Sequence, residues 1–176
     1  MAQEKWANAE EAYRAALLLQ PQSARWHSSL GYVLTELGKF KEGQPELRRA
    51  LELDPDGIQW HVNLGVALAQ QKDRWAEAFA EYKRAIELDP ENAGLFHHVG
   101  YELSSRGKFA EAEPFYRRAA QFDPKNAAQH ADLGKNLVQL QKYAEAEVAY
   151  REAVRLEAGN SDYRTQLRKV TEKMGK

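Results

Sequence analysis

The sequence predicts an all-α fold, a right-handed α-solenoid (superhelix) of antiparallel helix pairs. Two observations predict it. Pro21, Pro55, Pro90 and Pro124 end four similar phrases and stand 34, 35 and 34 residues apart. Between these prolines, apolar residues recur at spacings of three and four, which is typical of amphipathic helices. One helix pair cannot bury its apolar face alone, so neighbouring pairs are expected to stack.

The first helix of each repeat carries a glycine inside its apolar stripe. The four equivalent sets are His27/Leu30/Gly31/Leu34, His61/Leu64/Gly65/Leu68, Phe96/Val99/Gly100/Leu103 and His130/Leu133/Gly134/Leu137. Glycine in a helix interior costs about 1 kcal/mol relative to alanine. Because the cost recurs at the same position four times, we expect a second helix to approach there too closely for a Cβ atom.

The second helix of each repeat carries a small residue, then tyrosine or leucine four residues later, then alanine after three more. The trios are Ala9/Tyr13/Ala16, Gly43/Leu47/Ala50, Ala78/Tyr82/Ala85, Ala112/Tyr116/Ala119 and Ala146/Tyr150/Ala153. The small residues predict close helix contacts, and the larger ones are expected to fill the space between neighbours.

These motifs resemble those of the tetratricopeptide repeat (TPR) family, whose repeat is a helix-turn-helix unit of 34 residues. The resemblance covers nearly the whole chain. It implies a concave groove, lined by the first helices, that receives a peptide or helix of a partner protein. The sequence departs from the family pattern where the family has tryptophan, because His27, His61 and His130 stand there and Trp26 and Trp60 stand one residue earlier.

Helix caps indicate the repeat boundaries. Ser23, Asn92, Asn126 and Asn160, with Gly57 as a weaker fifth, stand where an N-cap residue is expected. A single TPR solenoid domain, 1–176, then comprises the second helix of a truncated repeat (1–23), full repeats 24–57, 58–92, 93–126 and 127–160, and a C-terminal cap helix (161–176). The extra residue of the 35-residue period is expected in the turn 72–74.

The predicted helix 6–19 starts the array with no first helix before it. We therefore expect the sequence to be a piece of a longer chain. Part of the apolar face of this helix lacks a neighbour, and such surfaces usually become contacts. The sequence thus also predicts self-association through this N-terminal helix.

Composition excludes several classes of chemistry. The formal net charge is −1 and cysteine is absent, so disulfides and thiolate chemistry are excluded and no charge excess draws the chain to nucleic acid. Apolar runs are far shorter than the ~20 residues that span a bilayer. We expect a soluble protein, favour a cytoplasmic location, and predict neither membrane insertion nor a nucleic-acid partner. A recurring set of basic residues on the second helices, Arg14, Arg48, Lys83, Arg117 and Arg151, is interpreted as a solvated face.

The sequence predicts no enzyme, no cofactor and no metal site. It has no nucleophile elbow, phosphate loop or His-Glu-x-x-His motif. His27, His61 and His130 lie in different repeats, and packed helices are roughly 8–10 Å apart, so these rings cannot share an ion through bonds of about 2 Å. We expect them to replace packing aromatics.

The resemblance places partner binding on the inner side of the first helices. The predicted groove residues are Arg25, Ser28, Tyr32, Glu36, Gln59, Val66, Gln70, His97, Tyr101, Ser105, Lys135 and Gln139. Tyr32 and Tyr101 are the expected anchors, because tyrosine is enriched among binding hot spots. The predicted function is a non-catalytic protein–protein interaction scaffold. The alternative is a docking or regulatory TPR segment of a larger enzyme such as a glycosyltransferase. Family members of that kind carry a row of asparagines along the groove, and in this sequence Asn63 is the single residue that fits such a row.

Overall fold

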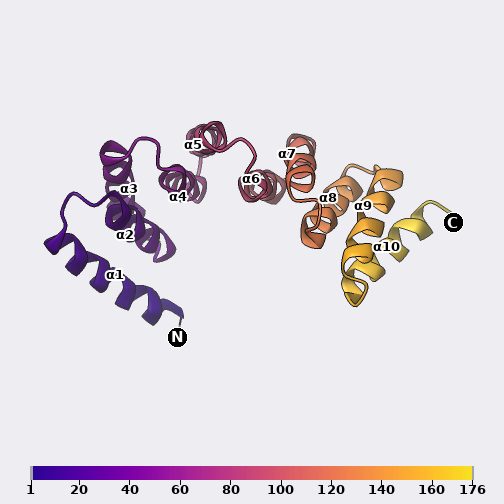
Figure 1. Ribbon diagram of the computed structural model, residues 1–176, viewed down its shortest axis with the longest axis horizontal. Coiled ribbons are helices and arrows are strands. Elements are labelled where there is room, and N and C mark those ends of the chain that lie inside the picture. The colour runs from indigo at the N-terminus through magenta and orange to yellow at the C-terminus, as the bar shows by residue number, and fades with distance from the viewer. Residues whose placement is uncertain (1, 176) are drawn as a thin grey trace. The chain divides into compact units, whose positions relative to one another are not determined.

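A computed structural model describes residues 2–175, and these residues form helices joined by short turns (Figure 1). The helices are α1 (Ala2–Leu19), α2 (Ala24–Glu36), α3 (Phe40–Leu53), α4 (Ile58–Ala69), α5 (Trp75–Leu88), α6 (Ala93–Ser105), α7 (Phe109–Phe122), α8 (Ala127–Gln139), α9 (Tyr143–Leu156) and α10 (Ser161–Lys173). Helices α2 and α3, α4 and α5, α6 and α7, and α8 and α9 pack most extensively as pairs. The predicted all-α repeat solenoid is confirmed.

The chain divides into two compact units, Met1–Pro90 and Glu91–Lys176, which we call the first and the second unit. The first unit holds α1 to α5 and the second unit holds α6 to α10. Met1 and Lys176, the ends of the predicted single domain, lie outside the described residues. That single domain stays a prediction.

The helix boundaries follow the predicted caps. Ser23, Asn92 and Asn160 each accept a hydrogen bond from a backbone N–H in the first turn of the next helix. Asn126 holds the N-cap position without this bond, and its side-chain nitrogen donates to Asp123 (3.1 Å). The cap helix α10 begins at the predicted Ser161 and ends at Lys173, before the predicted residue 176, whereas α1 begins at Ala2, before the expected residue 6.

The turns inside the helix pairs use a left-handed residue. Gly38 and Gly107 both have φ 73°, and Gln141 has φ 59° at the equivalent place. The turn between α4 and α5 spans residues 70–74 and places Asp73 at φ 66°. This turn is longer than the equivalent turns 37–39, 106–108 and 140–142, so the extra residue lies where the sequence predicted it.

The glycines in the first helices lie against the second helix of the same pair. A Cβ atom on Gly31 would stand 2.5 Å from Leu47 Cγ and 2.8 Å from the Gly43 carbonyl oxygen. The equivalent atom on Gly134 would stand 3.0 Å from the Tyr150 ring. Gly65 and Gly100 meet the rings of Tyr82 and Tyr116 in the same way. The predicted reason for these glycines, close approach of a neighbouring helix, is confirmed.

The apolar face of α1 is less completely buried than the equivalent faces of α3, α5, α7 and α9. Leu47, Tyr82, Tyr116 and Tyr150 are buried, whereas the equivalent Tyr13 is half-buried. Its ring lies 5.9 Å from the ring of Trp26 on α2. At the end of α1, Leu18 and Leu19 are each 85% exposed. Among the described residues, the apolar side of this helix therefore keeps open surface.

The basic residues of the second helices pair with acids. Arg14 lies 2.9 Å from Glu42 on the next second helix, Arg48 lies 3.9 Å from Glu77, and Arg117 contacts Glu145. Exposed ion pairs contribute about 0–1 kcal/mol each. These ion pairs balance the charge of the basic residues locally, which agrees with the interpretation of these residues as a solvent-exposed face.

Gly31→Ala should lower the free energy of unfolding by about 1–3 kcal/mol, the usual cost of overpacking. An ordinary glycine-to-alanine change inside a helix would raise it by about 1 kcal/mol. The control is Gly159→Ala, because a Cβ atom there meets nothing within 4 Å. Urea unfolding followed by circular dichroism measures both variants, and a stabilised Gly31→Ala protein would contradict the close contact.

Candidate functional site

Five predicted groove residues line one hollow in the second unit. His97, Tyr101, Ser105, Lys135 and Gln139 come from α6 and α8 and enclose about 510 Å³. Pockets that take a ligand or a peptide side chain have comparable volumes. The structure therefore brings this part of the predicted set together.

Hydrogen bonds hold the floor of this hollow. The Ser104 hydroxyl donates to Asn136 Oδ1 (2.8 Å), and Asn136 Nδ2 donates to the carbonyl oxygen of Phe109 (3.0 Å). His97 Nε2 donates to Asp132 Oδ2 (2.7 Å). These bonds join α6 and α8 to each other and to the start of α7. The polar groups of the floor are thus satisfied within the protein.

The rim of the hollow is exposed and chemically mixed. The Tyr101 ring is 58% exposed, and Ser105, Lys135 and Gln139 are exposed beside it. An aromatic anchor next to hydrogen-bond donors is a common composition of protein-binding surfaces. The rim can hold an apolar side chain and a hydrogen-bond acceptor of one partner segment.

Asp132 also determines the electrostatics around the hollow. Burial raises the pKa of the Tyr116 phenol, and the charge of Asp132 raises it further against a hydrogen bond with Ser104. Burial, with a smaller contribution from Asp132, raises the pKa of Tyr150 to about 12. Both phenols are therefore neutral near pH 7, and the fixed charges of the hollow are those of Asp132 and Lys135.

In the first unit, one of the predicted groove residues is buried in a contact between helices, and the others remain at least partly exposed. Ser28 is fully buried, and its hydroxyl accepts a hydrogen bond from Asn63 Nδ2 (2.9 Å). Gln59 Nε2 donates to Asn63 Oδ1 (2.8 Å). Ser28 therefore joins α2 to α4 and offers no surface to a partner.

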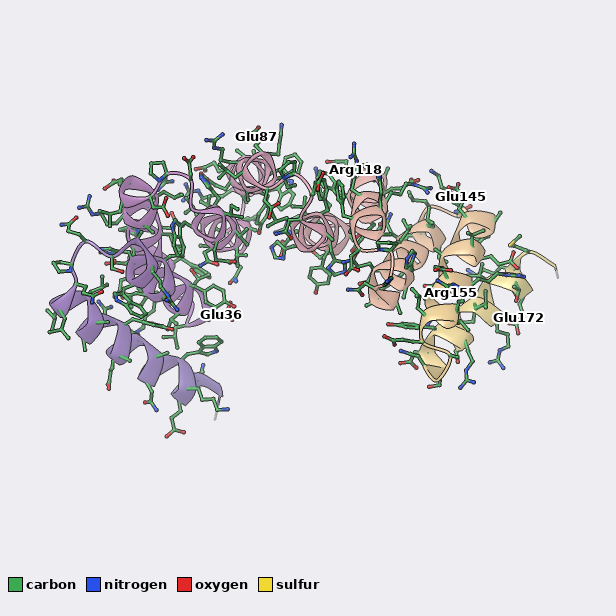
Figure 2. The ribbon with its side chains drawn as sticks, viewed as in Figure 1. Glu36, Glu87, Arg118, Glu145, Arg155 and Glu172 are labelled. Atoms are coloured by element: carbon green, nitrogen blue, oxygen red, sulfur yellow. The ribbon has the colours of Figure 1, made fainter. Side chains whose placement is uncertain are left out.

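The other predicted residues of the first unit are accessible to different degrees. Arg25, Glu36, Gln59 and Gln70 are exposed, whereas Tyr32 and Val66 are half-buried. The Tyr32 ring meets the Trp6 ring of α1 edge to face, with centroids 6.0 Å apart. Burial and then the charge of Glu36, labelled in Figure 2, raise the pKa of this phenol. Helix α1 thus covers part of the Tyr32 anchor.

The three equivalent histidines have structural roles. The Nε2 atoms of His27, His61 and His130 each lie 3.0 Å from the carbonyl oxygen of the preceding turn proline. This bond ties the start of the first helix to the turn before it. Over residues 2–175, no group of three His, Cys, Asp or Glu side chains could hold a metal ion.

Five residues of the hollow lie outside the predicted set, namely Ser104, Phe109, Tyr116, Asp132 and Asn136. Asn136 had a weak signal, because the equivalent position holds Val33 and Ala67 in the first two full repeats and Glu102 in the third. A buried polar residue where other repeats have an apolar one indicates either a hydrogen-bonded contact or a site. The role of Asp132 depends on its distance from His97, and this distance cannot be read from the sequence.

Comparison with known proteins identifies the family of the chain and solved structures with a similar fold. Family models described as tetratricopeptide repeat match residues 1–43, 34–93 and 103–169 of the chain. No curated protein sequence matches it significantly. None of the described helices is long and apolar enough to cross a membrane.

Solved structures with similar folds include three helical repeat proteins. The crystal structure of MamA aligns with a TM-score of 0.73 at 20% identity, over 89% of this chain and 91% of its own. A thermophilic TPR protein of Thermus thermophilus aligns with a TM-score of 0.69 at 17% identity, over 97% and 92%. YrrB, described as a TPR protein with an unusual peptide-binding site, aligns with a TM-score of 0.71 at 19% identity, over 95% and 86%. At these identities the likeness shows the fold alone.

Raising the pH should destabilise the protein partly through Tyr150. Its folded pKa of about 12 exceeds the ordinary value of 10.0. The folded state therefore holds this proton more tightly, so its stabilisation is complete below about pH 10 and is lost as the pH rises toward about 12. The free energy of unfolding should fall more steeply between about pH 10 and about pH 12 for the wild type than for Tyr150→Phe. Parallel pH curves from urea titrations would contradict the assignment.

Proposed function

Because this chain belongs to the tetratricopeptide repeat family, we propose that it is a non-catalytic scaffold that binds a peptide or helix of a partner protein. One observation carries the proposal. In the second unit, the exposed Tyr101 ring stands beside Lys135 and Gln139 over a floor whose hydrogen bonds are already made. A floor held in place loses little entropy on binding, so contacts at the rim translate into affinity.

The chemistry of the rim specifies the partner segment in outline. Tyr101 offers a flat amphipathic surface for an apolar side chain. Lys135 and Gln139 offer donors for a carboxylate or a backbone carbonyl. Since α6 and α8 both contribute, the partner segment lies across two first helices of the second unit.

The arrangement of the hollow favours binding over catalysis. His97 and Asp132 form a pair that could orient a general base. The Ser104 hydroxyl in the same hollow donates to Asn136 and is thus not engaged as a nucleophile for His97. The arginine–glutamate pairs of the second helices support a protein partner over a nucleic-acid partner, because their charge is already balanced. A cytoplasmic location completes the proposal, and fractionation of the native cells tests it.

The alternative, a docking segment of a larger enzyme such as a glycosyltransferase, has weaker support. This alternative requires a groove asparagine whose side chain is available to a partner. Asn63 is 9% exposed and bonds to Ser28 and Gln59. Its amide is committed to the contact between α2 and α4.

Tyr101→Ala should weaken binding of the native partner about tenfold or more, the usual effect of losing an aromatic hot spot. Tyr32→Ala should have a smaller effect, because the Trp6 ring covers part of Tyr32. The helical circular dichroism signal of Tyr101→Ala should stay near the wild-type value, since the residue is exposed. Partner affinity is measured after capture from the native cells, with Glu87→Ala as the exposed control. Unchanged affinity of Tyr101→Ala would move the site away from this hollow.

We also propose that two copies of the chain associate weakly through α1. Leu18 and Leu19 are each 85% exposed at the end of this helix, and Tyr13 is half-buried. Leu18→Glu should abolish the association, because a charge cannot be buried cheaply in an apolar contact. Sedimentation velocity over a range of concentrations measures it, with Arg164→Glu on α10 as a control that should still associate. A wild-type protein that remains a monomer at every concentration would contradict the proposal.

A further inference from the structure

A larger pocket lies on a different side of α8. It is formed by α7, α8 and α9 of the second unit and encloses about 760 Å³. Its apolar part includes Ala120, Leu133, Ala149 and the 68% exposed Val148. It shares no lining residue with the hollow around Tyr101. Figure 2 labels Glu145 and Arg155, which lie near the two ends of α9 and belong to its rim.

The equivalent place in the first unit is much smaller. There α3, α4 and α5 leave about 300 Å³ between residues that include Leu51, Leu64 and Glu81. Leu51 holds the position of Ala120, and Glu81 holds the position of Ala149. Two large side chains in the first unit therefore correspond to two alanines in the second. These two replacements remove side-chain volume from the larger pocket.

Glu81 does more than fill space. Its Oε2 accepts a hydrogen bond from His61 Nδ1 at 2.7 Å. In the preceding repeat, His27 Nδ1 makes the same bond to Glu46 at 2.6 Å. Each of these histidines therefore has a carbonyl acceptor for Nε2 and a carboxylate acceptor for Nδ1.

In the third and fourth repeats this pair of positions changes. Phe96 and Phe115 replace the histidine and the acid together, and their rings lie 6.3 Å apart. The fourth repeat keeps the histidine, and His130 Nε2 lies 3.0 Å from the Pro124 carbonyl oxygen as in the earlier repeats. Ala149, however, brings no carboxylate to its Nδ1 side. His130 lines the pocket in the orientation that elsewhere binds a carboxylate.

The arginines around the pocket are already paired with acids. Arg117 contacts Glu145, Arg151 donates to Glu147 (2.7 Å), and Arg155 donates to both oxygens of Glu152. The carboxylate-binding group of the pocket is therefore His130. The first unit has Glu52 and Glu81 at the positions of Gln121 and Ala149, so neither of these two positions brings a carboxylate to the larger pocket.

We propose that this pocket is a second protein-binding site, which takes a short acidic and apolar segment of a partner protein. A glutamate or aspartate carboxylate of the segment accepts a hydrogen bond from His130 Nδ1, as Glu81 does from His61 Nδ1 within the first unit. An adjacent apolar side chain fills the space between Ala120 and Ala149. The partner thereby supplies from outside the side chains that Glu81 and Leu51 supply within the first unit.

The test uses the full chain and a probe of defined chemistry. The probe is the acetylated and amidated peptide Leu-Glu-Leu-Glu, titrated against methyl NMR signals of Val148 and Leu133. Saturable shifts of both signals are expected in the millimolar range or below. The matched peptide Leu-Gln-Leu-Gln should bind about tenfold more weakly or worse, because a hydrogen bond to a charged group is lost.

Two variants copy the first unit and should close the pocket. Ala149→Glu restores the internal carboxylate and Ala120→Leu restores the side chain at the position of Leu51, so each should weaken peptide binding about tenfold or more. Unchanged helical circular dichroism shows that either variant folds. Tyr101→Ala should leave this binding unchanged, which separates this site from the proposed groove.

Three results would overturn the proposal. The first is the absence of saturable shifts at Val148 and Leu133 in the wild type. The second is equal binding of the glutamate and glutamine peptides, and the third is undiminished binding to folded Ala149→Glu and Ala120→Leu. Loss of binding in Tyr101→Ala would instead assign the peptide to the groove, and would equally overturn a second site.

Discussion

The close contact between the two helices of each pair is the constraint on which the rest of the structure depends. At Gly31 a single added carbon would meet the partner helix at 2.5 Å, so something would have to shift, and at Gly134 it would meet the Tyr150 ring at 3.0 Å, so the ring would have to move. This approach determines which side of each first helix is buried and which side remains available. The hollow around Tyr101 and the pocket around His130 lie on two sides of α8 that the contact with its partner helix leaves available.

Repetition of one backbone makes single side-chain replacements informative. Asn136 stands where Val33 and Ala67 stand in earlier repeats, and its amide links Ser104 to the Phe109 carbonyl. Ala149 stands where Glu46 and Glu81 bond to histidines, and the space beside it is more than twice that of its counterpart. In both cases the backbone geometry comes from the shared repeat, and the local chemistry comes from the residue that departs from it.

The two surfaces of the second unit differ in how their polar groups are satisfied. The floor of the Tyr101 hollow is held by one bond between His97 and Asp132 and another between Ser104 and Asn136, so a partner meets a fixed surface. The His130 pocket has an apolar interior, and its charged groups stand at the rim around Val148. Burial of an unpaired polar group costs about 1–3 kcal/mol, so a partner of the first surface must match its rim and a partner of the second must bring its own acceptor.

The sequence by itself determined the repeat, the helix order, the caps and the contacts at the glycines. Each of these depends on residues a few positions apart on one helix, or on a constant period, and α10 begins at its predicted residue, Ser161, for that reason. Only the tertiary structure decided that Ser28 is buried against Asn63, that Trp6 covers Tyr32, and that Asp132 lies beside His97. These contacts join residues 26 to 35 positions apart, and their geometry depends on the packing of side chains from neighbouring helices. A helical period indicates the face on which a residue lies, but it carries no information on which distant side chain fills the space in front of it.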